Sequence, residues 1–118
     1  MRHLICALAM LVPSVGAAQQ FDCARDQTQM ALNWCASQDW AVADAELNRL
    51  WRIVKPRADA AGWGQSLLTE QRAWLKTRDA RCEAERDRYA GGSIAPLVYY
   101  SCMEEMTLRR NDDFRAMR

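Results

Sequence analysis

Histidine is almost absent from this sequence. The chain has one, His3, and it lies in a segment with the layout of a secretory signal. That segment, Met1–Ala18, has a basic start, an apolar run and small residues before Gln19. The apolar run is too short to cross a bilayer as a helix. We therefore expect cleavage near Ala18 and a periplasmic or secreted product, residues 19–118, that contains no histidine.

The lack of histidine in the expected product excludes several kinds of chemistry. Neither a Ser-His nor a Cys-His nucleophile can be assembled, and a zinc site with a histidine ligand is equally excluded. Carboxylates are abundant, so an acid pair such as Glu46 and Asp79 is formally open, but no spacing singles such a pair out. We therefore expect a protein that is not an enzyme and that needs no cofactor.

An excess of charge of one sign is also missing. The chain has 16 Lys and Arg residues against 15 Asp and Glu residues, and loss of Arg2 with the signal makes the two numbers equal. Nucleic acids and anionic membranes select for basic proteins, so neither is expected as a partner. The expected product also has no second apolar segment that could serve as a membrane anchor.

Cysteine becomes informative once the signal is removed. Cys6 leaves with the signal, and four cysteines remain, namely Cys23, Cys35, Cys82 and Cys102. An even number in an exported chain of this size indicates two disulfides, which help a domain too small for a large core. The spacing contains no Cys-x-x-Cys pair, so a metal site made of these cysteines is not expected.

Glycine and proline are scarce, and they cluster over residues 56–64 and 91–96. Elsewhere apolar residues recur at steps of three and four, as on one face of a helix, and no alternating strand pattern is present. Pro56 should end or kink the first helix, and the charged residues 111–118 should fray. The pattern predicts an all-α fold with helices over 28–55, 66–89 and from 93 onwards, capped by Thr28, Ser66 and Ser93.

Folding the chain about residue 61 and again about residue 92 gives a small antiparallel three-helix bundle. In the second fold Cys82 lies level with Cys102, and both are on apolar stripes. This register favours a Cys82–Cys102 disulfide and leaves Cys23 for Cys35. Four cysteines allow two other pairings, so the connectivity at this point is an inference. Each disulfide would contribute on the order of 3 kcal/mol by constraining the unfolded chain.

Polar residues interrupt the predicted apolar stripes of the first two helices. The first fold places Asp44 level with Arg78, and Asn48 and Gln71 lie near them. A buried arginine needs a partner, because an isolated charge is costly in a low dielectric. We interpret these four residues as a structural polar network that fixes helix register. The alternative is a polar cleft that holds a ligand.

The two predicted loops offer residues for binding a partner. Trp63 lies between two glycines in the first loop, where an exposed tryptophan is a common binding anchor. Alternatively, Trp63 folds back to plug the end of the bundle. Arg88 and Ser93 flank the second loop, where Gly91 and Gly92 favour a turn. We treat Trp63, Arg88 and Ser93 as candidate partner-binding residues.

Three stretches of the sequence together resemble a known family. They are Asp44-Ala-Glu-Leu-Asn48, Gln71-Arg-Ala-Trp-Leu-Lys-Thr-Arg-Asp-Ala-Arg-Cys82 and Gly91-Gly-Ser-Ile-Ala-Pro96. They resemble the LprI-like lysozyme inhibitor domain family, over residues 23–110. The resemblance implies a small helical exported bacterial domain that inhibits lysozyme. It assigns no inhibitory residue, because the matching positions are those expected in the core, a turn and the disulfides.

Two functions are consistent with these expectations, and both require a protein partner. The first is inhibition of a lysozyme-type cell-wall hydrolase by occlusion of its active-site cleft. Such a cleft holds two carboxylates, which hydrogen-bond donors such as Arg88 would complement. The alternative is a non-catalytic structural or interaction module of the bacterial envelope with another partner.

Overall fold

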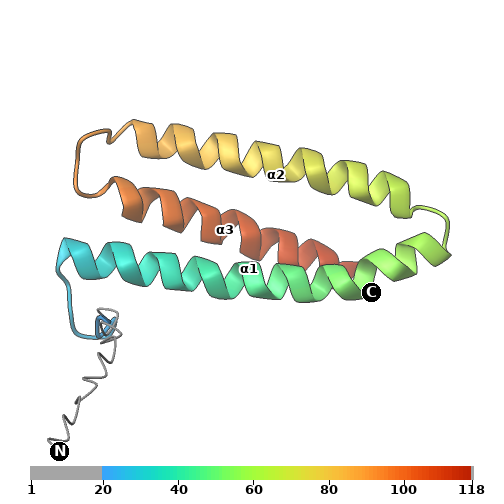
Figure 1. Ribbon diagram of the computed structural model, residues 1–118, viewed down its shortest axis with the longest axis horizontal. Coiled ribbons are helices and arrows are strands. Elements are labelled where there is room, and N and C mark those ends of the chain that lie inside the picture. The colour runs from blue at the N-terminus through green and yellow to red at the C-terminus, as the bar shows by residue number, and fades with distance from the viewer. Residues whose placement is uncertain (1–19, 118) are drawn as a thin grey trace, which may run out of the picture.

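The computed structural model describes residues 20–117, and the predicted signal segment lies outside them. The described chain forms three α-helices, which are α1 (Gln29–Ala60), α2 (Gly64–Asp87) and α3 (Ala95–Ala116). Successive helices run antiparallel and lie side by side (Figure 1). Residues 20–117 contain no strand, so the all-α, antiparallel three-helix bundle predicted from the sequence is confirmed.

The three helices do not contact one another equally. In Figure 1, α3 lies between α1 and α2. The interface between α1 and α3 is the most extensive, and the direct interface between α1 and α2 is the smallest. α1 and α2 therefore contact each other over only part of their length, and a groove remains between them.

The start of α1 follows the sequence prediction, but its end does not. Thr28 caps the helix, because its Oγ1 accepts a hydrogen bond from the Ala31 amide at 3.3 Å. Pro56 does not end the helix, which continues to Ala60. Instead α1 bends near its carboxyl end (Figure 1), as expected where a proline removes one backbone hydrogen bond.

The predicted caps of the other two helices are wrong. Ser66 lies inside the first turn of α2, where its hydroxyl donates to the Trp63 carbonyl at 2.9 Å. Ser93 makes no side-chain cap, and α3 begins at Ala95. The reason at α2 is the preceding turn. Gly62 adopts φ 87°, so the chain reverses at once after α1 and the next helix begins at Gly64.

Fraying was predicted for residues 111–118, but residues 111–116 belong to α3, and Arg118 lies outside the described residues. The helix continues to Ala116, and both Asn111 and Phe114 are fully buried. The ring of Phe114 lies 5.7 Å from the ring of Trp51 on α1. Burial of this aromatic side chain holds the last turns against the bundle, despite their charged neighbours.

Two apolar clusters lie at opposite ends of the bundle. The large core, nearer the α1–α2 turn, consists of Leu47, Leu50, Val54, Ala58, Leu67 and Phe114, with Trp51, Trp74 and Met117 packed against it. The disulfide core, nearer the α2–α3 loop, consists of Cys82, Cys102 and Met103, with Trp40, Tyr99 and Met106 packed against it.

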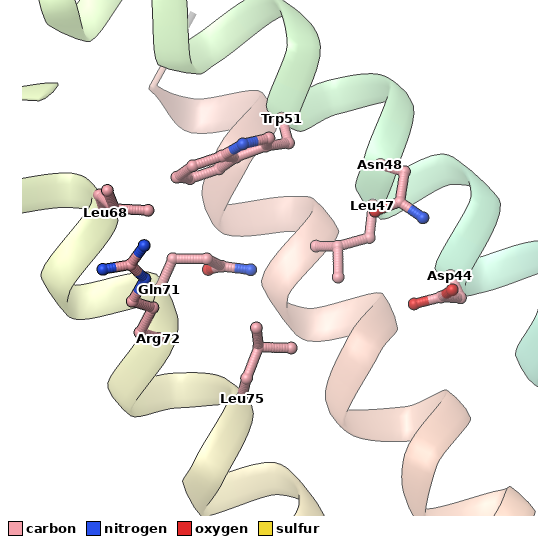
Figure 2. Close-up of a pocket in the computed structure, with 8 residues that line it drawn as sticks. All are labelled: Asp44, Leu47, Asn48, Trp51, Leu68, Gln71, Arg72 and Leu75. Carbon is pink, nitrogen blue, oxygen red and sulfur yellow. The ribbon is translucent and has the colours of Figure 1, made fainter.

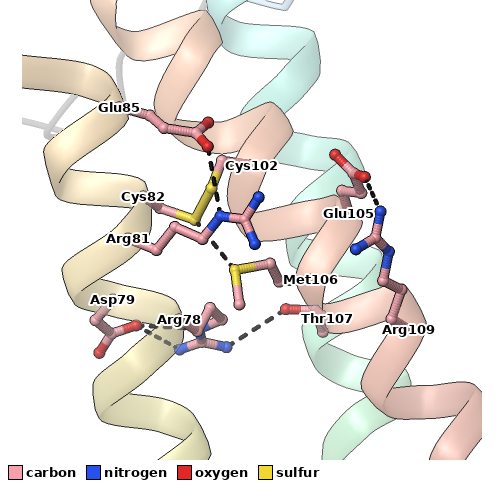
Figure 3. The surroundings of a disulfide bond; sticks show 10 residues. All are labelled: Arg78, Asp79, Arg81, Cys82, Glu85, Cys102, Glu105, Met106, Thr107 and Arg109. Carbon is pink, nitrogen blue, oxygen red and sulfur yellow. Dashed lines mark hydrogen bonds and ion pairs between the residues drawn. A yellow bond between two sulfur atoms is a disulfide. The ribbon is translucent and has the colours of Figure 1, made fainter. Parts of the chain in front are cut away.

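Both predicted disulfides are confirmed. Cys82–Cys102 joins α2 to α3 inside the disulfide core (Figure 3), and Cys23–Cys35 ties the segment before α1 onto that helix. Within residues 20–117, no helix combines the length and the apolar character needed to cross a membrane.

Candidate functional site

A layer of buried polar side chains separates the two cores. Arg78 is 6% exposed, and its Nε lies 3.0 Å from Asp79 Oδ1. Its Nη1 lies 3.4 Å from Thr107 Oγ1 and 3.9 Å from Asp44 Oδ1 (Figure 3 shows Asp79 and Thr107). The guanidinium also covers the ring of Trp74 at 5.1 Å. Asp79, the neighbouring residue, is thus a closer partner of Arg78 than the Asp44 expected from the helix register.

A second buried arginine, Arg110, was missed by the sequence analysis. It is 4% exposed, and its Nε donates to Gln71 Oε1 at 2.8 Å. Its Nη1 donates to Glu70 at 3.0 Å, and its guanidinium lies 4.8 Å from the ring centroid of Phe114. Gln71, assigned to a network around Arg78, therefore bonds to Arg110 on α3.

A signal for these residues was present in the sequence. Met103, Thr107, Arg110 and Phe114 follow steps of four, three and four, which place them on one helix face. Asn111 extends the same buried face, and its Nδ2 donates to the Ala43 carbonyl of α1 at 3.1 Å.

The groove between α1 and α2 is the first candidate site. It has a volume of about 270 Å³ and is open to solvent on one side. Figure 2 shows its lining from two helices, Asp44, Leu47, Asn48 and Trp51 on α1 and Leu68, Gln71, Arg72 and Leu75 on α2. Three of the four residues predicted to form a polar network thus line this groove, and Arg78 does not.

The loop between α2 and α3 is the second candidate site. Arg88 is exposed, and the exposed fractions of Tyr89 and Ile94 are 48% and 38%. The loop is nevertheless well ordered, because the amides of Tyr89, Ala90 and Gly92 all bond to carbonyls three residues earlier. Asn33 Nδ2 also donates to the Ser93 carbonyl at 2.9 Å and ties the loop to α1.

Trp63 lies at the opposite end of the bundle from Arg88 and Ser93. It is 38% exposed in the α1–α2 turn, and its amide donates to the Ala58 carbonyl at 2.9 Å. The 24 residues of α2 separate the two loops by about 36 Å, at ~1.5 Å per residue. The three candidate partner-binding residues therefore form two separate sites.

Ionised side chains also join α1 to α3 on a further face. Glu46 on α1 accepts hydrogen bonds from Arg49 at 2.7 Å and from Arg115 on α3 at 3.1 Å. These bonds, the one from Arg49 first, lower the pKa of Glu46 from 4.5 to about 2. Nearby, partial burial and the charge of Asp39 raise the pKa of Glu104.

Within the part of the chain that the structure describes, no three His, Cys, Asp or Glu side chains come together as a metal-binding group. The candidate sites are spread over the bundle, with one exposed loop at each end and the groove between α1 and α2 along its side. They belong to a small, disulfide-linked three-helix domain.

The particular family follows from comparison with known proteins. A family model described as lysozyme inhibitor LprI matches residues 22–114, and the chain therefore belongs to this family of inhibitors. An uncharacterized protein of Rhizobium meliloti (strain 1021) is 33% identical over 126 residues, which cover 97% of this chain and 88% of that relative. No solved structure matches the chain.

Proposed function

We propose that this protein is exported and inhibits a lysozyme-type cell-wall hydrolase by placing its α2–α3 loop in the active-site cleft. The observation that carries this proposal is the family match, which covers all of α1, α2 and both disulfides and most of α3. Two disulfides also suit an oxidising compartment outside the cytoplasm. The protein acts in this proposal as a binding module with no catalytic step of its own.

The shape of the α2–α3 loop supports its role as the inserted element. Residues 88–94 form the end of the bundle (Figure 1), and Tyr89 and Ile94 expose apolar surface there. Backbone hydrogen bonds and the nearby Cys82–Cys102 disulfide hold the loop in one shape, which lowers the entropy lost on binding. Aromatic residues in such positions supply much of the affinity of protein interfaces.

The chemistry of the loop supports the same role. A glycosidase of this type carries two carboxyl groups that flank the bond to be cleaved. Arg88 is exposed and has no ion-pair partner within residues 20–117. Its guanidinium is thus available to form charge-assisted hydrogen bonds with those carboxyl groups.

The proposal is tested with the protein purified from the periplasm, where mass spectrometry should find a chain that begins at Gln19. This product should slow lysis of bacterial cell walls by lysozyme at micromolar concentration or below. Arg88→Ala and Tyr89→Ala should each weaken inhibition at least tenfold, because each removes a central contact. Trp63→Ala, at the other end of the bundle, is the matched control and should inhibit like the natural protein.

Three outcomes would count against this assignment. Absence of inhibition with several lysozyme types would overturn the inhibitory function and favour an envelope interaction module with another partner. Loss of inhibition in Trp63→Ala, with Arg88→Ala unaffected, would move the contact to the α1–α2 turn. A full-length chain retained in the cytoplasm would overturn export.

A further inference from the structure

We propose that the groove between α1 and α2 binds one ring of a neutral saccharide. The proposal goes beyond inhibition, because the residues that line the groove lie within α1 and α2. The loop proposed to inhibit lies at the end of the bundle (Figure 1). Small-molecule sites are mostly apolar hollows with a few fixed polar groups, and they are usually larger than ~300 Å³. At about 270 Å³, this groove suits a single ring.

The position of Gln71 is the strongest argument for a ligand. This side chain is 7% exposed and lies at the floor of the groove. Since Arg110 Nε is a donor, the Gln71 atom that it contacts at 2.8 Å must be the carbonyl oxygen. The Gln71 NH₂ group then extends from α2 toward the groove (Figure 2). It makes no hydrogen bond to an acceptor within residues 20–117, and it is not one of the fully buried unpaired atoms, so it is open to a ligand in the groove. A buried arginine thus fixes an unused donor in the groove.

The apolar side of the groove offers a flat surface for a sugar ring. The Trp51 ring lies 5.7 Å from the Phe114 ring at an interplanar angle of 38°, and it extends across the groove toward Leu68 (Figure 2). Leu47 and Leu75 complete the apolar lining. A pyranose ring has one face of C–H groups, which can lie on an indole while the hydroxyl groups at the ring edge reach polar partners.

The charges around the groove indicate a neutral ligand. Asp44 brings one negative charge, Arg72 brings one positive charge, and Asn48 and Gln71 bring amides, so the lining has no net charge. An anion would be attracted by Arg72 but repelled by Asp44, and a cation would meet the reverse, so the lining as a whole favours neither charge. Hydroxyl groups both donate and accept, so they can pair with a carboxylate, a guanidinium and amides together. A single sugar ring carries enough hydroxyl groups to pair with these side chains and has no charge of its own.

The test uses the purified, disulfide-bonded protein without any lysozyme, so that its result is independent of the inhibition assay. Chitotriose, a neutral trimer of N-acetylglucosamine, is added while the side-chain NH signals are followed by NMR. Saturable shifts of the Gln71 amide and the Trp51 indole NH, with a Kd of about 1 mM or lower, are expected. No saturable shift at these two groups with chitotriose or maltotriose would overturn the proposal.

Two pairs of variants sharpen this test. Arg72→Ala should weaken chitotriose binding about tenfold, whereas Arg81→Ala, an exposed arginine of the same helix outside the groove, should not change it. Asn48→Leu should weaken binding similarly without loss of stability, because Asn48 is exposed. Inhibition of lysozyme should be unchanged in both groove variants.

Other results would contradict the site or its ligand. Binding that is insensitive to Arg72→Ala and Asn48→Leu would place the sugar elsewhere. Equal affinity for the anionic sugar glucuronic acid would contradict a neutral ligand. If lysozyme instead shifts the Gln71 amide and chitotriose does not, the groove contacts the protein partner and the saccharide proposal is wrong.

Discussion

At the α1–α2 end of the bundle, six buried apolar side chains and three partly buried ones pack together, and no disulfide lies among them. At the opposite end the buried cluster consists of Met103 and the two cysteines of a disulfide, and a second disulfide ties the chain before α1 to that helix. The two ends of one small bundle are thus held by different means.

This difference has a physical reason. A domain of about 100 residues buries too little apolar surface to form a large core along the whole length of its helices. Where the core is large, burial of apolar area stabilises the fold at about 25 cal/mol per Å². Where the core is small, a disulfide stabilises it by reducing the entropy of the unfolded chain. The exposed α2–α3 loop lies at the disulfide end, so the proposed binding element does not depend on a large core beneath it.

The largest effect should come from removing the central side chain of the large core. Phe114→Ala should lower the free energy of unfolding by about 3–5 kcal/mol, because Phe114 is fully buried against Trp51. Urea denaturation measures the loss. Leu108→Ala, on the same helix and 46% exposed, is the control and should change stability by less than ~0.5 kcal/mol. Equal losses in the two variants would contradict the central role of Phe114 in the large core.

The next effect should come from opening the disulfide core. The double variant Cys82→Ala/Cys102→Ala should lose about 3 kcal/mol, since this disulfide closes a loop between two helices. Cys23→Ala/Cys35→Ala is the matched comparison. It should lose less, because Cys23 and Cys35 are 12 residues apart and Cys82 and Cys102 are 20 apart, so this disulfide closes the shorter loop. A larger loss from this second pair would show that the segment before α1 belongs to the cooperative fold.

The smallest effect should come from the ionised link between α1 and α3. The folded pKa of Glu46 lies below its ordinary value, so its pairing with Arg49 and Arg115 stabilises the fold above about pH 4.5. That stability is lost as the pH falls toward 2. Glu46→Gln should therefore be slightly less stable than the natural protein at pH 7 and equally stable near pH 2, as measured by thermal unfolding.

Glu105→Gln provides the control for this pH dependence. Glu105 pairs with Arg109 of the same helix, so its loss removes a surface contact within α3 and leaves the link between helices intact. The stability of this variant should change less at pH 7 than that of Glu46→Gln. A Glu46→Gln variant whose deficit persists at pH 2 would contradict a link based on ionisation.

The sequence predicted the local features of this protein well where a single periodic pattern decides them. Three helices follow from the spacing of apolar residues, and the Thr28 cap follows from its hydroxyl. The hairpin register placed Cys82 opposite Cys102, and the structure confirms that disulfide. These features depend on neighbours in the chain or on two helices joined by a short loop.

The prediction was weaker where a residue's partner lies far along the chain. Arg110 is 39 residues from Gln71, and Asn111 is 68 residues from Ala43. A charged stretch such as residues 111–118 looks solvent-exposed until a distant helix covers one of its faces. The predicted Asp44–Arg78 pair shows the same limit. Asp79, Thr107 and Asp44 all lie near the Arg78 guanidinium, and only the folded geometry determines that Asp79 is closest.

The sequence by itself determined the helical pattern, the number of cysteines available for pairing and the lack of histidine in the expected mature chain, because each is a property of residue type and spacing. Only the tertiary structure decided that α3 lies between α1 and α2, that Arg110 holds Gln71, and that a groove with an unused donor remains between the outer helices. These features depend on how the three helices pack against one another, because each contact joins residues far apart in the chain and no local pattern specifies it.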